Sequence, residues 1–264
     1  MRRVSDLLLE MERIAPPAFA MEGDNVGLQA GDRDHPVEKV LLSLDPDDRA
    51  ITEAEKNGCD LLITHHALIF HPLRRLVPED PAAGRAIRLL KNGIALISMH
   101  TNLDAAKGGV NDALAEALGL REIEEFPNED ARPGIPSIGR IGRVDPVEGF
   151  DFVRKTVDAL RANGARYLLT GRRIEKVAVA GGSCADYVTA ARTAGCDALV
   201  TSECKYRHFT LARDLGISLI DAGHYATEAC VLGPLRERLR RAFPDLTFAI
   251  AEGDPVGVME RKEL

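Results

Sequence analysis

Short apolar runs alternate with amphipathic segments along the first half of the chain. Val, Ile and Leu dominate the runs of strand length at residues 40–44, 60–64 and 94–99. Segments with a helical period lie between and after them, at residues 47–56, 83–91 and 110–118, and a helical face at residues 7–15 precedes them all. Buried strands that alternate with helices are typical of βαβ units, so this half predicts an α/β fold with a largely parallel sheet.

The alternation returns in the second half of the chain. Strands are predicted at 138–144, 167–170, 176–180, 198–201, 218–221 and 246–251, and helices at 147–162, 185–194, 207–215 and 226–242. The stretch 121–136 is acidic and contains three prolines, which favours a linker. We therefore predict two α/β domains, 1–126 and 127–264, with the part from about residue 222 onward as a candidate to pack with the first.

Two predicted strands occur twice with nearly the same sequence. Gly-Cys-Asp-Leu-Leu-Ile-Thr at 58–64 returns as Gly-Cys-Asp-Ala-Leu-Val-Thr at 195–201, and Gly-Ile-Ala-Leu-Ile at 93–97 returns as Gly-Ile-Ser-Leu-Ile at 216–220. Glu-Lys-Val precedes both pairs, at 38–40 and at 175–177. Three matches in the same order favour an internal duplication of one α/β unit over a chance likeness between apolar strands.

Histidines and acids gather just after these repeated strands. The candidates are His65, His66, His100, Asp104, His224 and Glu228. In open α/β sheets, ligands bind beyond the carboxyl ends of the strands, because loops and helix starts converge there. A lone histidine in such a position is more often structural, but four at equivalent strand ends favour a metal site.

The spacing of these residues suggests two metal ions. Consecutive residues of an extended chain point to opposite sides, so the doublet His65-His66 is expected to serve two ions. His224 and Glu228 are four residues apart, which places both on one helix face. Imidazoles with carboxylates suit Zn, Fe, Mn, Co or Ni better than Mg or Ca. Two such ions would share a bridging water and lower its pKa.

Other polar residues are weaker candidates for a substrate site. Gly182 and Ser183 lie in a turn between a strand and a helix, where backbone N–H groups can bind a phosphate, although a tight structural turn explains them equally well. Lys205 either neutralises a substrate phosphate or belongs to a solvated helix start. His71 is a candidate partner for His66 or a loop residue, and His208 is expected to face solvent.

Composition narrows the class of protein. The chain has 264 residues and a net charge of -7, which argues against a general nucleic-acid-binding surface. No apolar run approaches the roughly 20 residues that span a bilayer. The five cysteines form no Cys-x-x-Cys pair, as is usual for reduced thiols. We therefore expect a cytoplasmic protein without a membrane partner.

Four ordered motifs resemble the family of GTP cyclohydrolase 1 type 2 homologues, also called Nif-three-like proteins. They are Asp-Asn-Val-Gly-Leu-Gln at 24–29, Thr-His-His at 64–66, His-Thr-Asn-Leu-Asp at 100–104 and Gly-His-Tyr-Ala-Thr-Glu at 223–228. The resemblance implies a two-domain α/β subunit, a ring-like homohexamer and a dinuclear metal centre between the domains. The family's metal ligands carry over to His65, His66, Asp104, His224 and Glu228. For His100, acid/base catalysis and a supporting role both stay open, besides metal binding.

Two functional hypotheses follow. The first is a metal-dependent hydrolase of a small phosphate-bearing or nucleotide-like substrate, for which the family name suggests the guanine ring of GTP. The chain has no Trp, so base stacking would fall to Phe or Tyr. The second is a non-catalytic metal carrier or a regulatory or assembly protein. The sequence leaves open the metal, the substrate and the role of residues 203–208.

Overall fold

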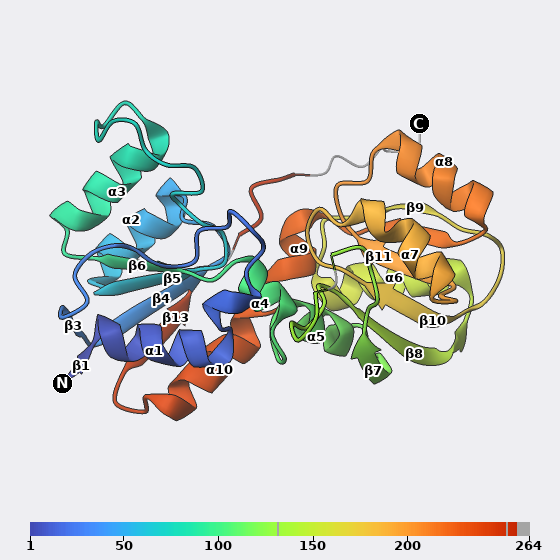
Figure 1. Ribbon diagram of the computed structural model, residues 1–264, viewed down its shortest axis with the longest axis horizontal. Helices are drawn as coiled ribbons and strands as arrows, with labels where there is room; N and C mark the ends of the chain where they lie inside the picture. Colours follow the sequence, from blue (N-terminus) through green and yellow to red (C-terminus); the bar gives the residue numbers. More distant parts are fainter. Residues whose placement is uncertain (131, 252, 258–264) are drawn as a thin grey trace, which may run out of the picture. The chain divides into compact units, whose positions relative to one another are not determined.

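The computed structural model describes residues 1–130, 132–251 and 253–257, which form two compact units (Figure 1). The first unit contains residues 1–109 and 231–251, and the second contains 110–130, 132–230 and 253–257. The predicted boundary at 126 was therefore too late, and the chain returns to the first unit at Val231. No helix in the described ranges has the length and apolar character needed to cross a membrane.

The first unit is built on a five-stranded sheet with the strand order β13-β4-β5-β6-β2. Its strands are β4 (Lys39–Ser43), β5 (Leu61–Thr64), β6 (Ala95–Ser98), β13 (Thr247–Ile250) and the antiparallel edge strand β2 (Gly27–Ala30). All other neighbours run parallel, as the alternating pattern predicts. A small ribbon pairs β1 (Arg2–Arg3) with β3 (Pro36–Val37).

Helices cover both faces of this sheet (Figure 1). On one face lie α2 (Asp48–Asn57) and α3 (Pro81–Lys91), and on the other lie α1 (Val4–Ile14) and α10 (Leu232–Ala242). The side chain of Asp47 caps α2 by accepting a hydrogen bond from the N–H of Ala50, and Gly58 ends that helix in the left-handed region. Two short helices complete the unit, η1 (Pro17–Phe19) and α4 (Thr101–Ala105).

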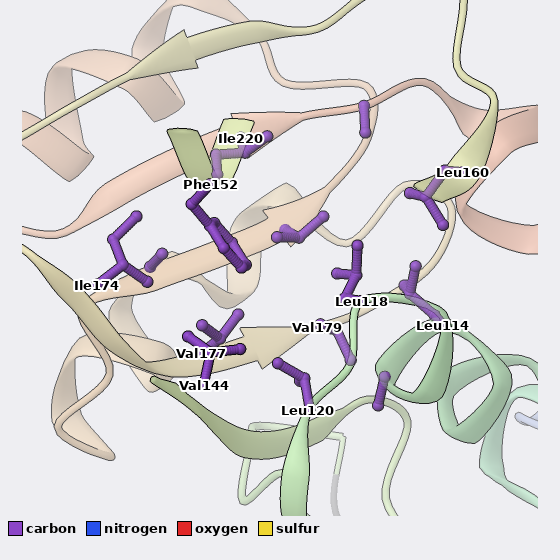
Figure 2. Close-up of a cluster of buried hydrophobic side chains, with 14 of the residues drawn as sticks. Leu114, Leu118, Leu120, Val144, Phe152, Leu160, Ile174, Val177, Val179 and Ile220 are labelled. Atoms are coloured by element: carbon purple, nitrogen blue, oxygen red, sulfur yellow. The ribbon is translucent and has the colours of Figure 1, made fainter. Parts of the chain in front are cut away.

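The second unit has a six-stranded sheet with the order β7-β8-β10-β11-β12-β9. Its parallel centre consists of β10 (Ile174–Val179), β11 (Ala198–Thr201) and β12 (Ser218–Asp221), flanked by the antiparallel strands β7 (Arg121–Glu125), β8 (Arg140–Val147) and β9 (Arg166–Leu168). The helices are α5 (Val110–Ala117), α6 (Gly149–Leu160), η2 (Ala185–Tyr187), α7 (Val188–Thr193), α8 (Tyr206–Leu215) and α9 (His224–Ala229). Figure 2 shows the core, where Phe152 of α6 lies among Val177, Ile174 and Ile220 of the sheet.

Two predicted segments differ from the observed structure. The start of the predicted linker is a strand instead, because residues 121–125, three of which are glutamates, form the exposed edge strand β7, which pairs with β8. An edge strand tolerates charge on its solvent side, so its composition resembled that of a loop. The single helix predicted at 226–242 is broken into α9 and α10, which belong to different units. Pro234 lacks the N–H that a continuous helix would need there.

The repeated sequence segments make matching hydrogen bonds in the two units. Asp60 Oδ2 accepts the N–H groups of Glu38 and Lys39, at 2.8 and 3.0 Å. In the second unit, Asp197 Oδ2 accepts the corresponding N–H groups at 175 and 176, at 3.0 and 2.9 Å. The repeat therefore has a structural cause, since the Gly-Cys-Asp segment anchors the start of the neighbouring strand. The two sheets and their helices confirm the α/β prediction. The matching hydrogen bonds extend the sequence likeness to the local geometry.

We expect Asp60→Ala and Asp197→Ala each to lower the free energy of unfolding by about 1 kcal/mol, because each removes an acceptor of two strand-initiating hydrogen bonds. Denaturant unfolding of the two variants would measure the effect. Asp214→Ala is the control, since Asp214 is exposed and forms an ion pair with the adjacent Arg213. Equal stability of all three variants would contradict the shared anchoring role.

Candidate metal centre

Three imidazoles converge at the carboxyl end of the sheet in the first unit. His65 and His66 follow β5 and His100 follows β6, and one ligand atom from each lies within 4.8 Å of the other two. The rings of the doublet are only 5.0 Å apart, so the prediction that they point to opposite sides was wrong. Both residues lie beyond the last residue of β5, where the alternation of a strand no longer holds.

Each of these imidazoles is held through its Nδ1 atom by an oxygen. His65 Nδ1 lies 2.9 Å from the carbonyl oxygen of Met99, and His66 Nδ1 lies 2.7 Å from Asp45 Oδ1. His100 Nδ1 lies 2.8 Å from Asp24 Oδ1. These oxygens can only accept, so each ring carries its proton on Nδ1 when neutral, and the lone pair is on Nε2. Metal-binding histidines typically have this second hydrogen bond.

Asp24 orients His100 as a charged group. Its carboxylate is only 3% exposed and also accepts the N–H of Thr101 at 3.1 Å, together with the hydroxyl of the same residue. Burial alone would raise the pKa of Asp24, but the hydrogen bonds from His100 and Thr101 lower that pKa to about 2. The side chain therefore stays ionised at neutral pH.

Asp24 and Asp45 were both missed as site residues by the sequence analysis. Asp45 follows β4 and could have been found by the rule that located the histidines, because it lies at the same carboxyl edge of the sheet. Asp24 contacts a residue 76 positions away, and no local spacing in the sequence signals that contact.

A carboxylate completes this half-site. Asp104 lies on α4 and is buried, with Oδ1 3.6 Å from His65 Nε2. His100 is the N-cap residue of the same helix, and its carbonyl oxygen accepts the N–H of Asp104 at 3.2 Å. We call His65, His66, His100 and Asp104 the three-histidine half-site.

The second unit presents a smaller group on α9. His224 and Glu228 lie on one face of this helix, as their spacing predicted, with Nε2 3.0 Å from Oε2. His224 Nδ1 lies 2.6 Å from Glu203 Oε1, so this imidazole is held through Nδ1 like the other three. Glu228 is 4% exposed. We call His224 and Glu228 the helix half-site.

The glycine turn after β10 supports this helix. The N–H of Gly181 donates to Asn111 Oδ1 at 2.8 Å, and the N–H of Gly182 donates to Thr227 Oγ1 at 3.1 Å. These two N–H groups are therefore used within the protein, in contrast to the predicted phosphate contact. Gly182 has a φ of +68°, and a Cβ there would lie 2.1 Å from Glu228 Oε1. The turn therefore makes room for the carboxylate. Ser183 and Lys205 are exposed and stay predictions as substrate contacts.

Two other histidines differ from expectation or lie apart. His208 is buried rather than solvent-facing, because its Nδ1 accepts the N–H of Lys205 at 3.0 Å at the start of α8. Its Nε2 lies 3.1 Å from Asp186 Oδ1, which makes it a structural residue. His71 is exposed, and the predicted place beside His66 belongs to Asp45.

The donor atoms of both half-sites suit a transition metal ion. Imidazole nitrogens outnumber carboxylates, whereas Mg and Ca sites are built from oxygen ligands. Four imidazoles have Nδ1 fixed by an oxygen, which is the arrangement that prepares Nε2 to bind a metal. The residues therefore fit zinc, iron, manganese, cobalt or nickel.

The chain is similar to known proteins in both sequence and fold. A family model described as Duf34/NIF3 (NGG1p interacting factor 3) matches residues 2–255. A GTP cyclohydrolase 1 type 2 homolog of Clostridium perfringens is 31% identical over 254 residues, which cover 95% of this chain and 96% of that protein. The crystal structure of a Bacillus cereus protein related to NIF3 aligns with a TM-score of 0.91 at 22% identity, covering 98% and 99% of the two chains. A hypothetical protein of Staphylococcus aureus aligns with a TM-score of 0.89 at 26% identity, covering 97% and 99%.

Proposed function

The chain belongs to the Duf34/NIF3 family, as its four motifs predicted, and we propose that its two half-sites together hold two divalent metal ions. We propose further that this centre hydrolyses a small phosphate-bearing or nucleotide-like substrate. Curated relatives are named GTP cyclohydrolase 1 type 2 homologs, which supports nucleotides as the first substrates to test. A homohexamer in the cytoplasm is the assembly that we propose.

The observation that carries this proposal is the common orientation of four imidazoles. His65, His66, His100 and His224 each have Nδ1 within 2.9 Å of a carbonyl or carboxylate oxygen. Core histidines have no general reason to share one tautomer, whereas metal ligands and a proton acceptor beside them both need an unprotonated Nε2. Asp104 and Glu228 add the negative charge that would offset bound cations.

Each residue would contribute a separate part of the chemistry. Divalent ions bound by His65, His66, Asp104, His224 and Glu228 would supply Lewis acidity toward water and phosphate oxygens. His100 would accept a proton at Nε2, because the ionised Asp24 stabilises the imidazolium through Nδ1. Asp45 would keep the ring of His66 in place.

A metal analysis combined with a hydrolysis screen tests the proposal. The purified protein should contain two transition metal ions per chain and hydrolyse at least one nucleotide or phosphoester, and a chelator should remove both properties. Bound metal without metal-dependent turnover would instead favour a metal carrier or regulatory protein. Absence of bound metal after supply of zinc, manganese and iron would contradict the proposal as a whole.

Phe70 is the candidate for contact with a planar ring. It is 47% exposed, and its ring lies 5.9 Å from that of His100 in an edge-to-face arrangement. The preceding Ile69 is held on both sides, because its carbonyl accepts from Asn25 Nδ2 at 2.6 Å and its N–H donates to Gln29 Oε1 at 2.9 Å. The family motif at 24–29 thus fixes the loop that presents Phe70.

We expect Phe70→Ala to raise KM for a purine nucleotide by about 5- to 150-fold, because stacking on an aromatic ring contributes about 1–3 kcal/mol. KM for a non-aromatic phosphoester such as glycerol phosphate should change little. Tyr206→Ala is the control, since Tyr206 is 82% exposed on α8. An equal change in KM for the two substrates, relative to the wild type, would contradict a stacking role of Phe70.

A further inference from the structure

Glu203 has an unusual backbone conformation. Its φ of 54° lies in the left-handed region, which costs a residue with a Cβ about 1–2 kcal/mol. Within the described ranges, only Glu122 and Arg161 share a positive φ among residues other than glycine. Arg161 ends α6, and Glu122 lies at the irregularity in the pairing of β7 with β8. Glu203 belongs to neither kind of position, since it lies in the connection between β11 and α8.

The neighbours of Glu203 hold this conformation in place. On one side, the N–H and the hydroxyl of Ser202 both donate to the carbonyl oxygen of Gly182, at 3.0 and 2.6 Å. On the other side, the N–H of Cys204 donates to Asp221 Oδ2 at 3.0 Å, and Arg166 donates to the carbonyl oxygen of Cys204 at 2.8 Å. The backbone is therefore fixed on both sides of the strained residue.

The same contacts reach the partner of Glu203. Asp221 Oδ1 accepts the N–H of Gly223 at 3.3 Å, directly before His224. One carboxylate thus anchors the residue after Glu203 and the residue before His224. The Glu203 side chain is 57% exposed, yet its Oε1 lies 2.6 Å from His224 Nδ1. Because the carboxylate of Glu203 is exposed, burial does not hold it in place. Its defined position depends on the fixed, strained backbone.

We propose that Glu203 is a positioning residue, whose strained backbone is held by Asp221 so that its carboxylate fixes His224 with the proton on Nδ1. The basic Nε2 of His224 is then directed toward Glu228, 3.0 Å away. The metal-binding part of this inference rests on the proposed function, whereas the hydrogen bond between His224 Nδ1 and Glu203 is present without metal. Glu203 thereby gains a role within the segment 203–208, whose function the sequence left open.

Glu203→Gly provides a test with opposite effects on stability and on metal binding. Glycine adopts a positive φ without strain, so the melting temperature of the metal-free variant should rise by a few degrees. Without the Glu203 carboxylate, Glu228 is the remaining acceptor, 3.0 Å from Nε2, so nitrogen-15 NMR spectra of the metal-free variant should show the proton of His224 on Nε2. The affinity for Zn²⁺ should fall by about 10- to 100-fold. Loss of a merely structural contact would lower the melting temperature.

Two further variants make the comparison specific. Glu122→Gly relieves a strained, exposed glutamate of the same unit, at a φ of 52°, and should raise the melting temperature without altering His224 or Zn²⁺ binding. Glu203→Gln keeps an oxygen acceptor at the same position and should retain the Nδ1-protonated tautomer and most of the affinity for Zn²⁺.

The possible results separate this inference from the proposed function. If the wild type binds Zn²⁺ and Glu203→Gly binds it equally well, the positioning role is overturned. A wild-type His224 that carries its proton on Nε2 in the metal-free protein would overturn it as well. If the wild type binds no Zn²⁺, the proposed function fails, and the tautomers of wild type and Glu203→Gly still decide whether Glu203 orients His224.

Discussion

Glu228→Gln is expected to remove both bound metal and metal-dependent turnover. The substitution preserves the size of a side chain that is only 4% exposed, so the fold should persist while the negative charge is lost. Residues that merely orient a ligand typically contribute 10- to 100-fold to metal affinity, and we expect a loss of more than about 100-fold for a ligand itself. Titration with Zn²⁺ and elemental analysis of the variant would measure it.

The isosteric change makes the outcome interpretable. Circular dichroism and the melting temperature of the metal-free protein should match those of the wild type closely enough to exclude unfolding. Full metal content in the variant would contradict the role of Glu228 as a ligand. Full metal content with lost turnover would move Glu228 from metal binding to catalysis.

Gly182→Ala is expected to weaken metal binding by displacing Glu228 rather than by unfolding the protein. A Cβ at this position would lie 2.1 Å from Glu228 Oε1 and 3.3 Å from His224 Nε2. The obstructing atom is the end of a side chain, so the carboxylate can rotate away and the fold can absorb the methyl group. The positive φ of 68° adds about 1–2 kcal/mol of backbone strain.

Gly195→Ala separates the two contributions. Gly195 has a similar φ of +75°, and nothing lies within 4 Å of a Cβ built there. Both variants should therefore lose about 1–2 kcal/mol of unfolding free energy, while only Gly182→Ala should lose affinity for Zn²⁺. An equal effect of both variants on Zn²⁺ binding would show that the close approach of Glu228 to Gly182 does not contribute to Zn²⁺ affinity.

The strands and the polar residues after them could be predicted from local pattern alone. Buried parallel strands are continuous apolar runs, and the residues that follow them lie at one edge of a sheet. This reasoning located His65, His66, His100 and Asp104 in one half-site and paired His224 with Glu228. It also found the repeat whose Asp60 and Asp197 make equivalent hydrogen bonds.

The features that local pattern did not predict depend on contacts distant in the sequence. The sequence made the part from about residue 222 onward a candidate to pack with the first domain, but the place of its last strand depends on a distant contact, since β13 pairs with β4 about 200 residues earlier. His208 was expected in solvent because the short sequence around it is polar. Its ring is buried instead, and its Nδ1 accepts the N–H of Lys205 at the start of α8. The strain at Glu203 is likewise invisible in a sequence, since a positive φ at glutamate has no compositional signal.

The side chains of His65 and His66 do not follow the alternation expected for a β-strand. Alternation along a strand applies only to residues within the strand, and β5 ends at Thr64. The N–H of His66 donates to the carbonyl oxygen of Leu44 at 2.9 Å, so the chain is still anchored there but no longer follows β5. A doublet placed one residue beyond a strand end can therefore bring both rings to one cluster.

We propose that the three-histidine half-site and the helix half-site hold one pair of ions together. Electron paramagnetic resonance of the protein loaded with two equivalents of Mn²⁺ tests this most directly. The spectrum should be that of an exchange-coupled manganese pair, and it should revert to that of isolated ions when either His65 or Glu228 is substituted. A spectrum of isolated Mn²⁺ in the wild type, unchanged by both substitutions, would contradict it.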